Sequence, residues 1–189
     1  DEKRALLTDM ITATLVRNPE LQYYQGFHDV SVVFIEVFED EPDLAFSLIE
    51  TASKHFLKDF MGEDFHTVTN TLPLILQIIK KVDVKLFAFL SKALTEPYFA
   101  TSWLITWFAH DVKDMNTVAR IFDGLITSHP LFCLYVSTAI VLSCKEKIFA
   151  MECEMSRIHN FLVNICEHDS ISFDEILVNA IDQSTQDKT

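Results

Sequence analysis

The chain has few of the residues from which tight turns and phosphate-binding loops are built. Its 189 residues include three glycines and five prolines. All-β proteins need many tight turns, for which glycine and proline supply the backbone angles, and a P-loop needs a glycine-rich segment whose amides bind phosphate. The shortage of these residues therefore disfavours an all-β fold, excludes nucleotide binding by a P-loop, and favours a helical protein.

Basic side chains are also scarce. The chain has 15 Lys and Arg against 28 Asp and Glu, a net charge of −13. A nucleic-acid-binding protein needs a basic face to displace the counterions of the phosphates, and anionic membranes attract basic segments. The composition thus argues against a nucleic-acid partner and against direct binding to an anionic membrane. It fits a surface kept acidic for solubility, and it also fits a partner rich in Arg and Lys.

Paired cysteines and long apolar runs are lacking as well. The four cysteines, at positions 133, 144, 153 and 166, include no C-x-x-C spacing, which is typical of reduced cysteine in the cytosol rather than of a zinc or redox site. The histidines are not at zinc-ligand spacing either, so no metal site is predicted. The longest apolar run, residues 131–144, is shorter than the roughly 20 residues that span a bilayer. We expect no membrane span in this chain.

Apolar residues recur at helical spacing along nearly the whole chain, and prolines divide it into segments. Residues 32–38 are apolar almost all round and predict a buried central helix, with a strand as the alternative because β-branched residues dominate. Residues 131–144 predict a second buried helix, and Ser172-x-x-Glu175 is a capping box before the last one. There is no repeat or linker, so we expect one all-α domain of about nine or ten packed helices over residues 1–189.

One loop combines residues that could carry chemistry. The heptapeptide YYQGFHD, residues 23–29, lies between the Asn18-Pro19 turn and the apolar segment that follows. A side-chain amide both donates and accepts hydrogen bonds, and Gly26 leaves room for another backbone to approach Gln25. The residues by themselves equally describe a plain loop, in which both tyrosines pack on the core and Gln25 is solvated.

Three short motifs resemble, in this order, those of the TBC-domain family of Rab GTPase-activating proteins. Tyr23-x-Gln25-Gly26 resembles its Y-x-Q-G motif, Ser102-Trp103 with Thr106-Trp107-Phe108 resembles S-W…T-x-F, and Arg120-Ile121-Phe122-Asp123 resembles R-x-[WF]-D. The resemblance covers nearly the whole chain. It implies an all-helical fold and activation of a Rab GTPase in vesicle trafficking. It also implies a cytoplasmic protein, with the cytosolic face of endoplasmic reticulum or Golgi membranes as the expected place of action.

The resemblance implies how the motif residues act. In this family an arginine and a glutamine are inserted in trans: the arginine neutralises transition-state charge, an effect of about 10³ to 10⁵ in rate, and the glutamine orders the attacking water. Gln25 is, by resemblance, the glutamine finger, and its neighbours Tyr23, Tyr24, Gly26 and Asp29 form the motif and contact the partner. Mg-GTP is held by the partner GTPase, so the resemblance implies no cofactor belonging to the chain itself.

Two further residue pairs are expected to support this site. Arg120 and Asp123 are three residues apart on one predicted helix, a spacing that allows a local ion pair near the site. Trp103 and Trp107 are four residues apart and are expected to anchor the core beneath the docking face. We interpret all four as structural rather than catalytic.

The family's arginine motif, I-x-x-D-x-x-R, does not occur among the 24 residues that precede Gln25. Arg4 and Arg17 are the arginines in that stretch, and neither has the motif's Ile and Asp before it. We therefore expect a TBC domain whose N-terminal arginine-finger segment lies outside this sequence, and weak activation by the chain alone. The alternatives are a member that binds a Rab without catalysis, and a helical scaffold.

Overall fold

The computed structural model describes residues 2–64, 66–94, 96–167 and 171–186. These residues form helices and no strand, so the predicted all-α fold class is confirmed. The α-helices are α1 Glu2–Arg17, α2 Phe27–Val37, α3 Pro42–His55, α4 His66–Thr71, α5 Pro73–Val82, α6 Val84–Ala93, α7 Thr101–Thr106, α8 Met115–Ile126, α9 Phe132–Ser143, α10 Lys145–Phe149, α11 Met155–Val163 and α12 Phe173–Gln186. Three 3₁₀-helices, η1 Lys58–Phe60, η2 Tyr98–Ala100 and η3 Ile165–Glu167, complete the described structure.

The helices outnumber the expected nine or ten because some of them are very short. α4 and α7 have six residues each and α10 has five, which is too short for a helical period to show in the sequence. Pro73 occupies the first turn of α5, where its missing amide hydrogen costs no hydrogen bond. Residues 32–38, for which a strand was the alternative, belong to α2 apart from its C-cap Phe38. The expected burial on all sides is not found, because Val33, Phe34 and Ile35 are buried but Val37 is 47% exposed.

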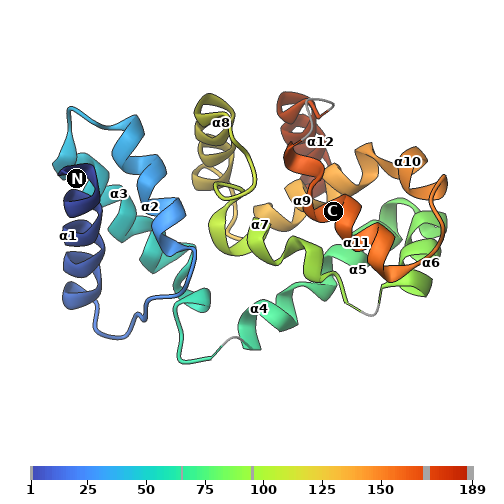
Figure 1. Cartoon of the computed structure of the whole chain (residues 1–189), viewed down its shortest axis with the longest axis horizontal. Coiled ribbons are helices and arrows are strands. Elements are labelled where there is room, and N and C mark those ends of the chain that lie inside the picture. Colours follow the sequence, from blue (N-terminus) through green and yellow to red (C-terminus); the bar gives the residue numbers. More distant parts are fainter. Residues whose placement is uncertain (1, 65, 95, 168–170, 187–189) are drawn as a thin grey trace.

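Helix α9 forms the centre of the molecule. Nine of its 12 residues are buried, as predicted for residues 131–144. It packs against α12, α5 and α7, which therefore surround it in Figure 1. A helix that is apolar on all sides is stable only when neighbours cover every face, and these three helices provide that cover.

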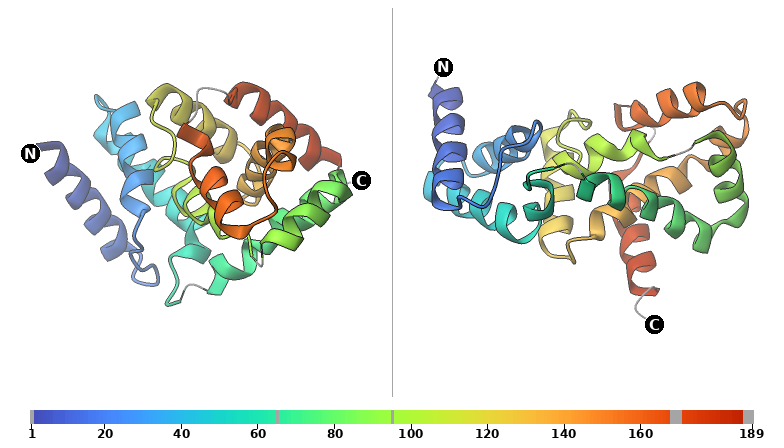
Figure 2. Two further views of the ribbon diagram at one scale, coloured as in Figure 1. Left: turned by 45° about the vertical axis from the view of Figure 1, so that its right-hand side comes forward. Right: turned by 90° about the horizontal axis from the view of Figure 1, so that it is seen from below.

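Helices α1, α2 and α3 form the N-terminal end of the molecule, and α6 and α10 lie at the opposite end (Figure 1). Both turned views show α1 at the edge of the molecule (Figure 2). Helix α7 lies between the two ends, since it contacts α2 on one side and α4 and α9 on the other. The short α7 therefore joins the N-terminal helices to the central core.

An aromatic cluster fixes this junction. The Trp107 ring meets Phe56 and Phe122 edge-on, with ring centroids 5.6 and 5.3 Å apart, and Phe122 in turn meets Phe34 at 5.4 Å. Edge-to-face pairs add about 0.5–1.5 kcal/mol each beyond the area that they bury. The cluster thus ties the end of α7 to α2, α8 and the residue that follows α3.

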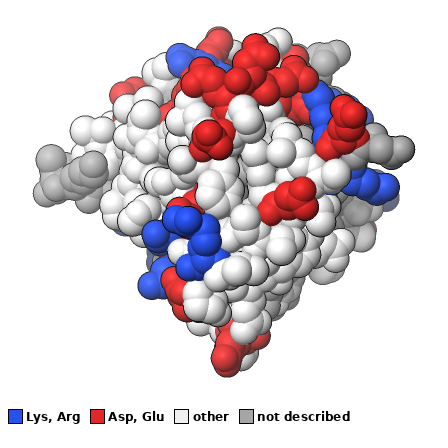
Figure 3. Space-filling model, turned by 90° about the vertical axis from the view of Figure 1, so that its left-hand side faces the viewer, with Lys and Arg blue, Asp and Glu red and all other residues white. Residues whose placement is uncertain are grey.

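The surface carries the excess of acidic side chains. On the face that α1 contributes to, Asp and Glu gather along one edge, and Lys and Arg form smaller separate patches (Figure 3). In the described part of the chain no helix is long and apolar enough to cross a membrane. The same residues include no group of three or more His, Cys, Asp or Glu side chains arranged to hold a metal ion. All four cysteines are free thiols, and burial raises the pKa of Cys144 to about 12.

Candidate functional site

Gly26 sets the path of the chain into α2. It is the N-cap of that helix and has a φ of 118°, a left-handed conformation that side chains other than hydrogen rarely allow. A Cβ built on Gly26 would lie 2.9 Å from Cγ2 of Thr106 on α7. Glycine is therefore needed here twice, for the backbone angle and for the close approach of α7.

The two tyrosines before Gln25 have different surroundings. Tyr24 is 9% exposed, and its hydroxyl donates a 2.6 Å hydrogen bond to the carbonyl oxygen of Ile105 in α7. Burial raises the pKa of the Tyr24 phenol well above its usual value, so it remains a donor at any physiological pH. Tyr23 is 50% exposed, and its hydroxyl lies 3.0 Å from Nδ1 of His28. The plain-loop interpretation, with both tyrosines packed on the core, therefore holds for Tyr24 alone.

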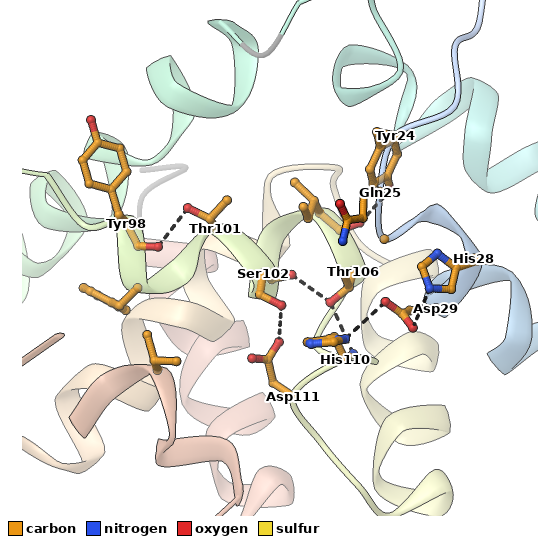
Figure 4. Close-up of a pocket in the computed structure, with 14 residues that line it drawn as sticks. Tyr24, Gln25, His28, Asp29, Tyr98, Thr101, Ser102, Thr106, His110 and Asp111 are labelled. Carbon is orange, nitrogen blue, oxygen red and sulfur yellow. Dashed lines mark hydrogen bonds and ion pairs between the residues drawn. The ribbon is translucent and has the colours of Figure 1, made fainter. Parts of the chain in front are cut away.

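Gln25 lies between Tyr24 and Gly26, which both contact α7, and its own side chain is exposed. It lines a groove of about 680 Å³ that runs from the start of α2 along α7 to α11 (Figure 4). The groove residues are Tyr24, Gln25, Gly26, His28, Asp29, Tyr98, Phe99, Thr101, Ser102, Ile105, Thr106, His110, Asp111 and Val163. Within the described structure the Gln25 carboxamide has no hydrogen-bond partner, so its donor and acceptor are both available to a bound molecule.

A sharp turn at the end of α7 completes one wall of the groove. Trp107 and Phe108 have φ values of 52° and 66°, a conformation that non-glycine residues adopt only where the surroundings hold them. Both side chains are buried, at 3% and 0% exposure. The turn brings the chain back beside α7, where Asp111 Oδ2 accepts a 2.8 Å hydrogen bond from the Ser102 hydroxyl.

Asp29 lies in the first turn of α2 between two histidines (Figure 4). Its Oδ1 is 3.5 Å from Nε2 of His28, and its Oδ2 is 3.4 Å from Nδ1 of His110. A carboxylate at a helix N-terminus is stabilised by the helix dipole. The two carboxylate oxygens thus have separate partners, one from the same helix turn and one from the chain after α7.

The fold brings two of the three motifs together. Gln25 and Gly26 of the first motif and Ser102 and Thr106 of the second all line the groove, although about 80 residues separate them in sequence. Four further residues line the groove that the sequence did not indicate as site residues: Tyr98, His110, Asp111 and Val163. His110 and Asp111 directly follow the second motif, and that proximity is the one signal that could have indicated them.

The third motif, residues 120–123, does not line the groove but lies behind its wall. Phe122 belongs to the aromatic cluster, but Arg120 points to α12, where its Nε lies 3.4 Å from Oδ1 of Asp174. The expected ion pair of Arg120 with Asp123 is therefore not formed, and Arg120 lines a separate depression with Ser172 and Phe173. Residues at i and i+3 of a helix can form an ion pair, but a long side chain such as that of Arg120 can also reach a carboxylate on a neighbouring helix.

The two tryptophans are buried at different places. α7 ends at Thr106, and Trp107 is its left-handed C-cap, so the two side chains do not share one helical face. Trp103, with 0% exposure, packs against Phe99 and Phe108 at 5.3 and 5.8 Å between ring centroids. Trp107 packs in the aromatic cluster described above. Together they form the core under the wall of the groove.

Neither arginine upstream of Gln25 lines the groove. Arg17 closes α1, where its Nε donates a 2.8 Å hydrogen bond to Oε1 of Glu50 on α3. Its guanidinium also lies over the ring of Phe46, 5.8 Å from the centroid. Arg4 is exposed near the start of α1. In the described structure Gln25 is therefore not accompanied by an arginine.

Known proteins similar to this chain are TBC-domain and GTPase-activating proteins. The profile of the Rab-GTPase-TBC domain family matches residues 1–149. TBC1 domain family member 20 of Bos taurus and of Homo sapiens is 38% identical over 159 residues, which are 84% of this chain and 39% of each relative. GTPase-activating protein gyp10 of Schizosaccharomyces pombe is 36% identical over 179 residues, 93% of this chain and 47% of the relative. The chain thus spans less than half the length of these relatives.

Solved structures share the fold. The crystal structure of the Ypt/Rab-GAP domain of Gyp1p has a TM-score of 0.81 at 19% identity, and the match covers 96% of this chain and 66% of that one. The Chlamydomonas flagellar RabGAP TBC domain has a TM-score of 0.74 at 16% identity, covering 95% and 59%. At such low identity these likenesses bear on the fold alone. With the profile match over most of its residues, this chain belongs to the Rab-GTPase-TBC domain family.

Proposed function

We propose that this chain is a GTPase-activating core that acts on a Rab-type small GTPase, with Gln25 as the glutamine supplied in trans. The observation that carries the proposal is the state of Gln25: an exposed, unpaired carboxamide on a groove, between two residues that α7 holds in place. A side chain of this kind can enter a partner's active site without first breaking bonds within its own protein.

The chemistry follows from what the carboxamide can do. The partner holds Mg-GTP, and the attacking water must be oriented in line with the bond that breaks. An amide can accept a hydrogen bond from that water and donate one to a phosphate or backbone oxygen at the same time. Because Tyr24 and Gly26 are fixed on α7, little conformational freedom is lost when the partner docks.

The arginine is the part that this chain does not place at the groove. Arg17 is paired with Glu50, and Arg4 is exposed near the start of α1 and does not line the groove that contains Gln25. We therefore propose that the chain alone activates weakly, because an arginine finger is worth about 10³ to 10⁵ in rate. Binding of a Rab without catalysis is the second candidate function, favoured by this same observation.

The name of one relative supports a GTPase partner, because gyp10 is named a GTPase-activating protein. We extend this to a Rab partner in membrane trafficking. We also propose action in the cytoplasm, at the cytosolic face of the endoplasmic reticulum or Golgi. Fractionation of cells that express the tagged protein tests this location, and recovery in the lumen of a vesicle fraction would contradict it.

The activity is tested by single-turnover GTP hydrolysis with a panel of purified Rab proteins. Each Rab is measured with the chain and with a chimera in which the chain replaces its matching segment in TBC1 domain family member 20. We expect the chimera to accelerate hydrolysis by at least one Rab, and Gln25→Ala to reduce that rate about 10²-fold, as for loss of one preorganised hydrogen-bonding group.

The matched control is Gln22→Ala, which removes the same side chain from the same loop at an exposed position outside the groove. It is expected to keep the full rate. Acceleration that Gln25→Ala leaves unchanged would show that Gln25 is not the finger. Tight binding of a GTP-loaded Rab with no acceleration in any form would leave the binding module as the function.

A further inference from the structure

The Gln25 loop is attached to α7 and the turn after it at three points. The Tyr24 hydroxyl bonds the Ile105 carbonyl at 2.6 Å, and Gly26 packs on the methyl group of Thr106. The third point is the contact between the Asp29 carboxylate and the His110 ring, whose Oδ2 and Nδ1 lie 3.4 Å apart. The first two points lie in buried surroundings, whereas the His110 side chain is 66% exposed and lines the same groove as Gln25.

We propose that His110 is a positioning residue for Gln25, and that it acts by holding the carboxylate of Asp29. This inference rests on the proposed function, because its consequence is the placement of the catalytic glutamine. Asp29 is the third residue of α2, and its backbone amide donates a 3.0 Å hydrogen bond to the carbonyl oxygen of Gly26. A contact that restrains Asp29 therefore also restrains Gly26, the residue next to Gln25.

His110 is the partner that matters because it comes from another element. His28 also approaches Asp29, at 3.5 Å, but it is the adjacent residue in the same helix turn, so this contact stays within α2. The His28 ring is turned outward to Tyr23, whose hydroxyl lies 3.0 Å from its Nδ1. The contact between His110 and Asp29 is thus a polar link between the first turn of α2 and the chain beyond α7.

The backbone around His110 supports this role. The amide of His110 lies 3.4 Å from Oγ1 of Thr106, and the next residue, Asp111, is bonded to Ser102. Two consecutive left-handed residues, Trp107 and Phe108, are needed to turn the chain back to these contacts. Strained conformations of this kind persist where other interactions hold them, and they cluster at functional sites. The turn places the backbone of His110 beside α7, with its ring next to Asp29.

Because one ring nitrogen of His110 faces Asp29, variants that keep, move or remove that nitrogen can be compared. His110 approaches Asp29 through Nδ1. The amide nitrogen of asparagine occupies nearly the position of Nδ1, whereas that of glutamine corresponds to Nε2. His110→Asn therefore keeps a nitrogen at the position that faces Asp29, while His110→Ala removes it and His110→Gln displaces it. His55→Ala is the matched control, since His55 is an exposed histidine of α3 that lies outside the groove.

The first experiment measures kcat and KM for the Rab that responds best to the chimera described above. We expect His110→Ala to lower kcat about tenfold, with KM unchanged within about twofold, because a small misplacement of a catalytic group reduces rate more than binding. His110→Asn should keep kcat within about threefold of the unsubstituted protein, and His110→Gln should resemble His110→Ala. In a Gln25→Ala background, His110→Ala should have no further effect, since the two residues act through one group.

A second experiment needs no partner and remains decisive if no Rab responds. Amide hydrogen exchange is followed in the chain alone, over residues 26–30 and over α9. We expect His110→Ala and Asp29→Asn to speed exchange at residues 26–30 at least about threefold and to leave α9 unchanged, because only the local opening becomes easier. His55→Ala should change neither region.

The two experiments separate the possible failures. Absence of Rab acceleration in every form would overturn the proposed function, and the exchange data would then decide whether His110 holds the start of α2. Unchanged exchange in His110→Ala would overturn the positioning role. So would a further loss of kcat in the Gln25→Ala background, or a His110→Asn variant as impaired as His110→Ala.

Discussion

Gly26 and Thr106 illustrate how single residues determine the shape of the site. The φ of Gly26 is 118°, and any side chain added there would also meet the Thr106 methyl group at 2.9 Å. Alanine at position 26 must therefore bear both backbone strain and a close contact. We expect Gly26→Ala to lower the free energy of unfolding by about 1–3 kcal/mol, measured by urea denaturation.

Two control variants divide this effect into its parts. A Cβ added to Gly62 would have no heavy atom within 4 Å, and the backbone there is not left-handed, so Gly62→Ala should change stability by less than about 0.5 kcal/mol. Thr106→Ser removes the methyl group and keeps the hydroxyl that bonds the Ser102 carbonyl. In the Gly26→Ala background it should recover part of the loss. Equal stability of the Gly26→Ala and Gly62→Ala proteins would contradict this account.

At the scale of the element, the start of α8 depends on one side chain. The Asp114 carboxylate is the N-cap, and its Oδ2 accepts hydrogen bonds from the Thr117 amide and hydroxyl at 2.8 and 2.7 Å. The Thr117 hydroxyl, and then its amide, holds the pKa of Asp114 below its usual value. α8 carries Phe122 of the aromatic cluster, so its first turn bears on the junction behind the groove.

The prediction concerns both the cap and its pH dependence. A depressed carboxyl pKa contributes stability that is fully present above the unfolded value, about 3.9, and is lost as the pH falls through the folded value. We expect Asp114→Ala to lower Tm by about 2–4 °C at pH 7. Asp114→Asn, which still caps, should match the unsubstituted protein at pH 7 but lose less stability as the pH falls below about 3.9.

The control for a change of charge is Asp123→Ala, which removes an exposed carboxylate from the same helix without touching its cap. It should leave Tm nearly unchanged. A Tm for Asp114→Ala that equals that of Asp123→Ala, in thermal scans followed by circular dichroism, would show that the cap contributes nothing measurable.

At the scale of the whole molecule, α1 is the most weakly attached helix at the N-terminal end. Only Met10 and Thr14 of its residues are buried, and it lies at the edge of the fold (Figure 2). Its outer links are the exposed pairs of Lys3 with Glu36 and Glu39, and the pair of Arg17 with Glu50. Exposed ion pairs contribute little and are weakened by salt.

We therefore expect α1 to open without the rest of the molecule. Its amide hydrogens should exchange at least about tenfold faster than those of the buried α9, and the difference should grow when the salt concentration rises from about 0.05 to 0.5 M. Hydrogen exchange with mass spectrometry measures both regions in one experiment. Equal protection of α1 and α9 would mean that the fold opens as one unit.

Much of the helical architecture can be predicted from the sequence. The 3.6-residue period depends on residues within one or two turns of each other, so it predicted that 32–37 are helical and that 131–144 form a buried helix. The capping box before α12 is local too, and the Glu175 amide does lie 3.5 Å from the Ser172 hydroxyl. Helix α10 was missed because a run of five residues has no visible period.

The motif residues could be named from the sequence, but their arrangement could not. That Gly26 meets Thr106, and that Asp29 meets His110, depends on how α2 and α7 pack, and no residue nearby in the sequence encodes this contact. Arg120 pairs with Asp174, 54 residues away in the sequence, rather than with the nearby Asp123. The left-handed turn at Trp107 and Phe108 contains no glycine, so only the buried packing of both rings explains it.

The sequence by itself thus determined the composition of the fold: its helices, its buried segments, its acidic charge and the glutamine motif. Each of these depends on residue type and local spacing, which are present in the chain before it folds. The tertiary structure alone decided which motif faces which, where the groove lies and what holds Gln25 in place. Those features depend on helix packing, where side chains distant in sequence compete for the same contacts and the best-packed arrangement prevails.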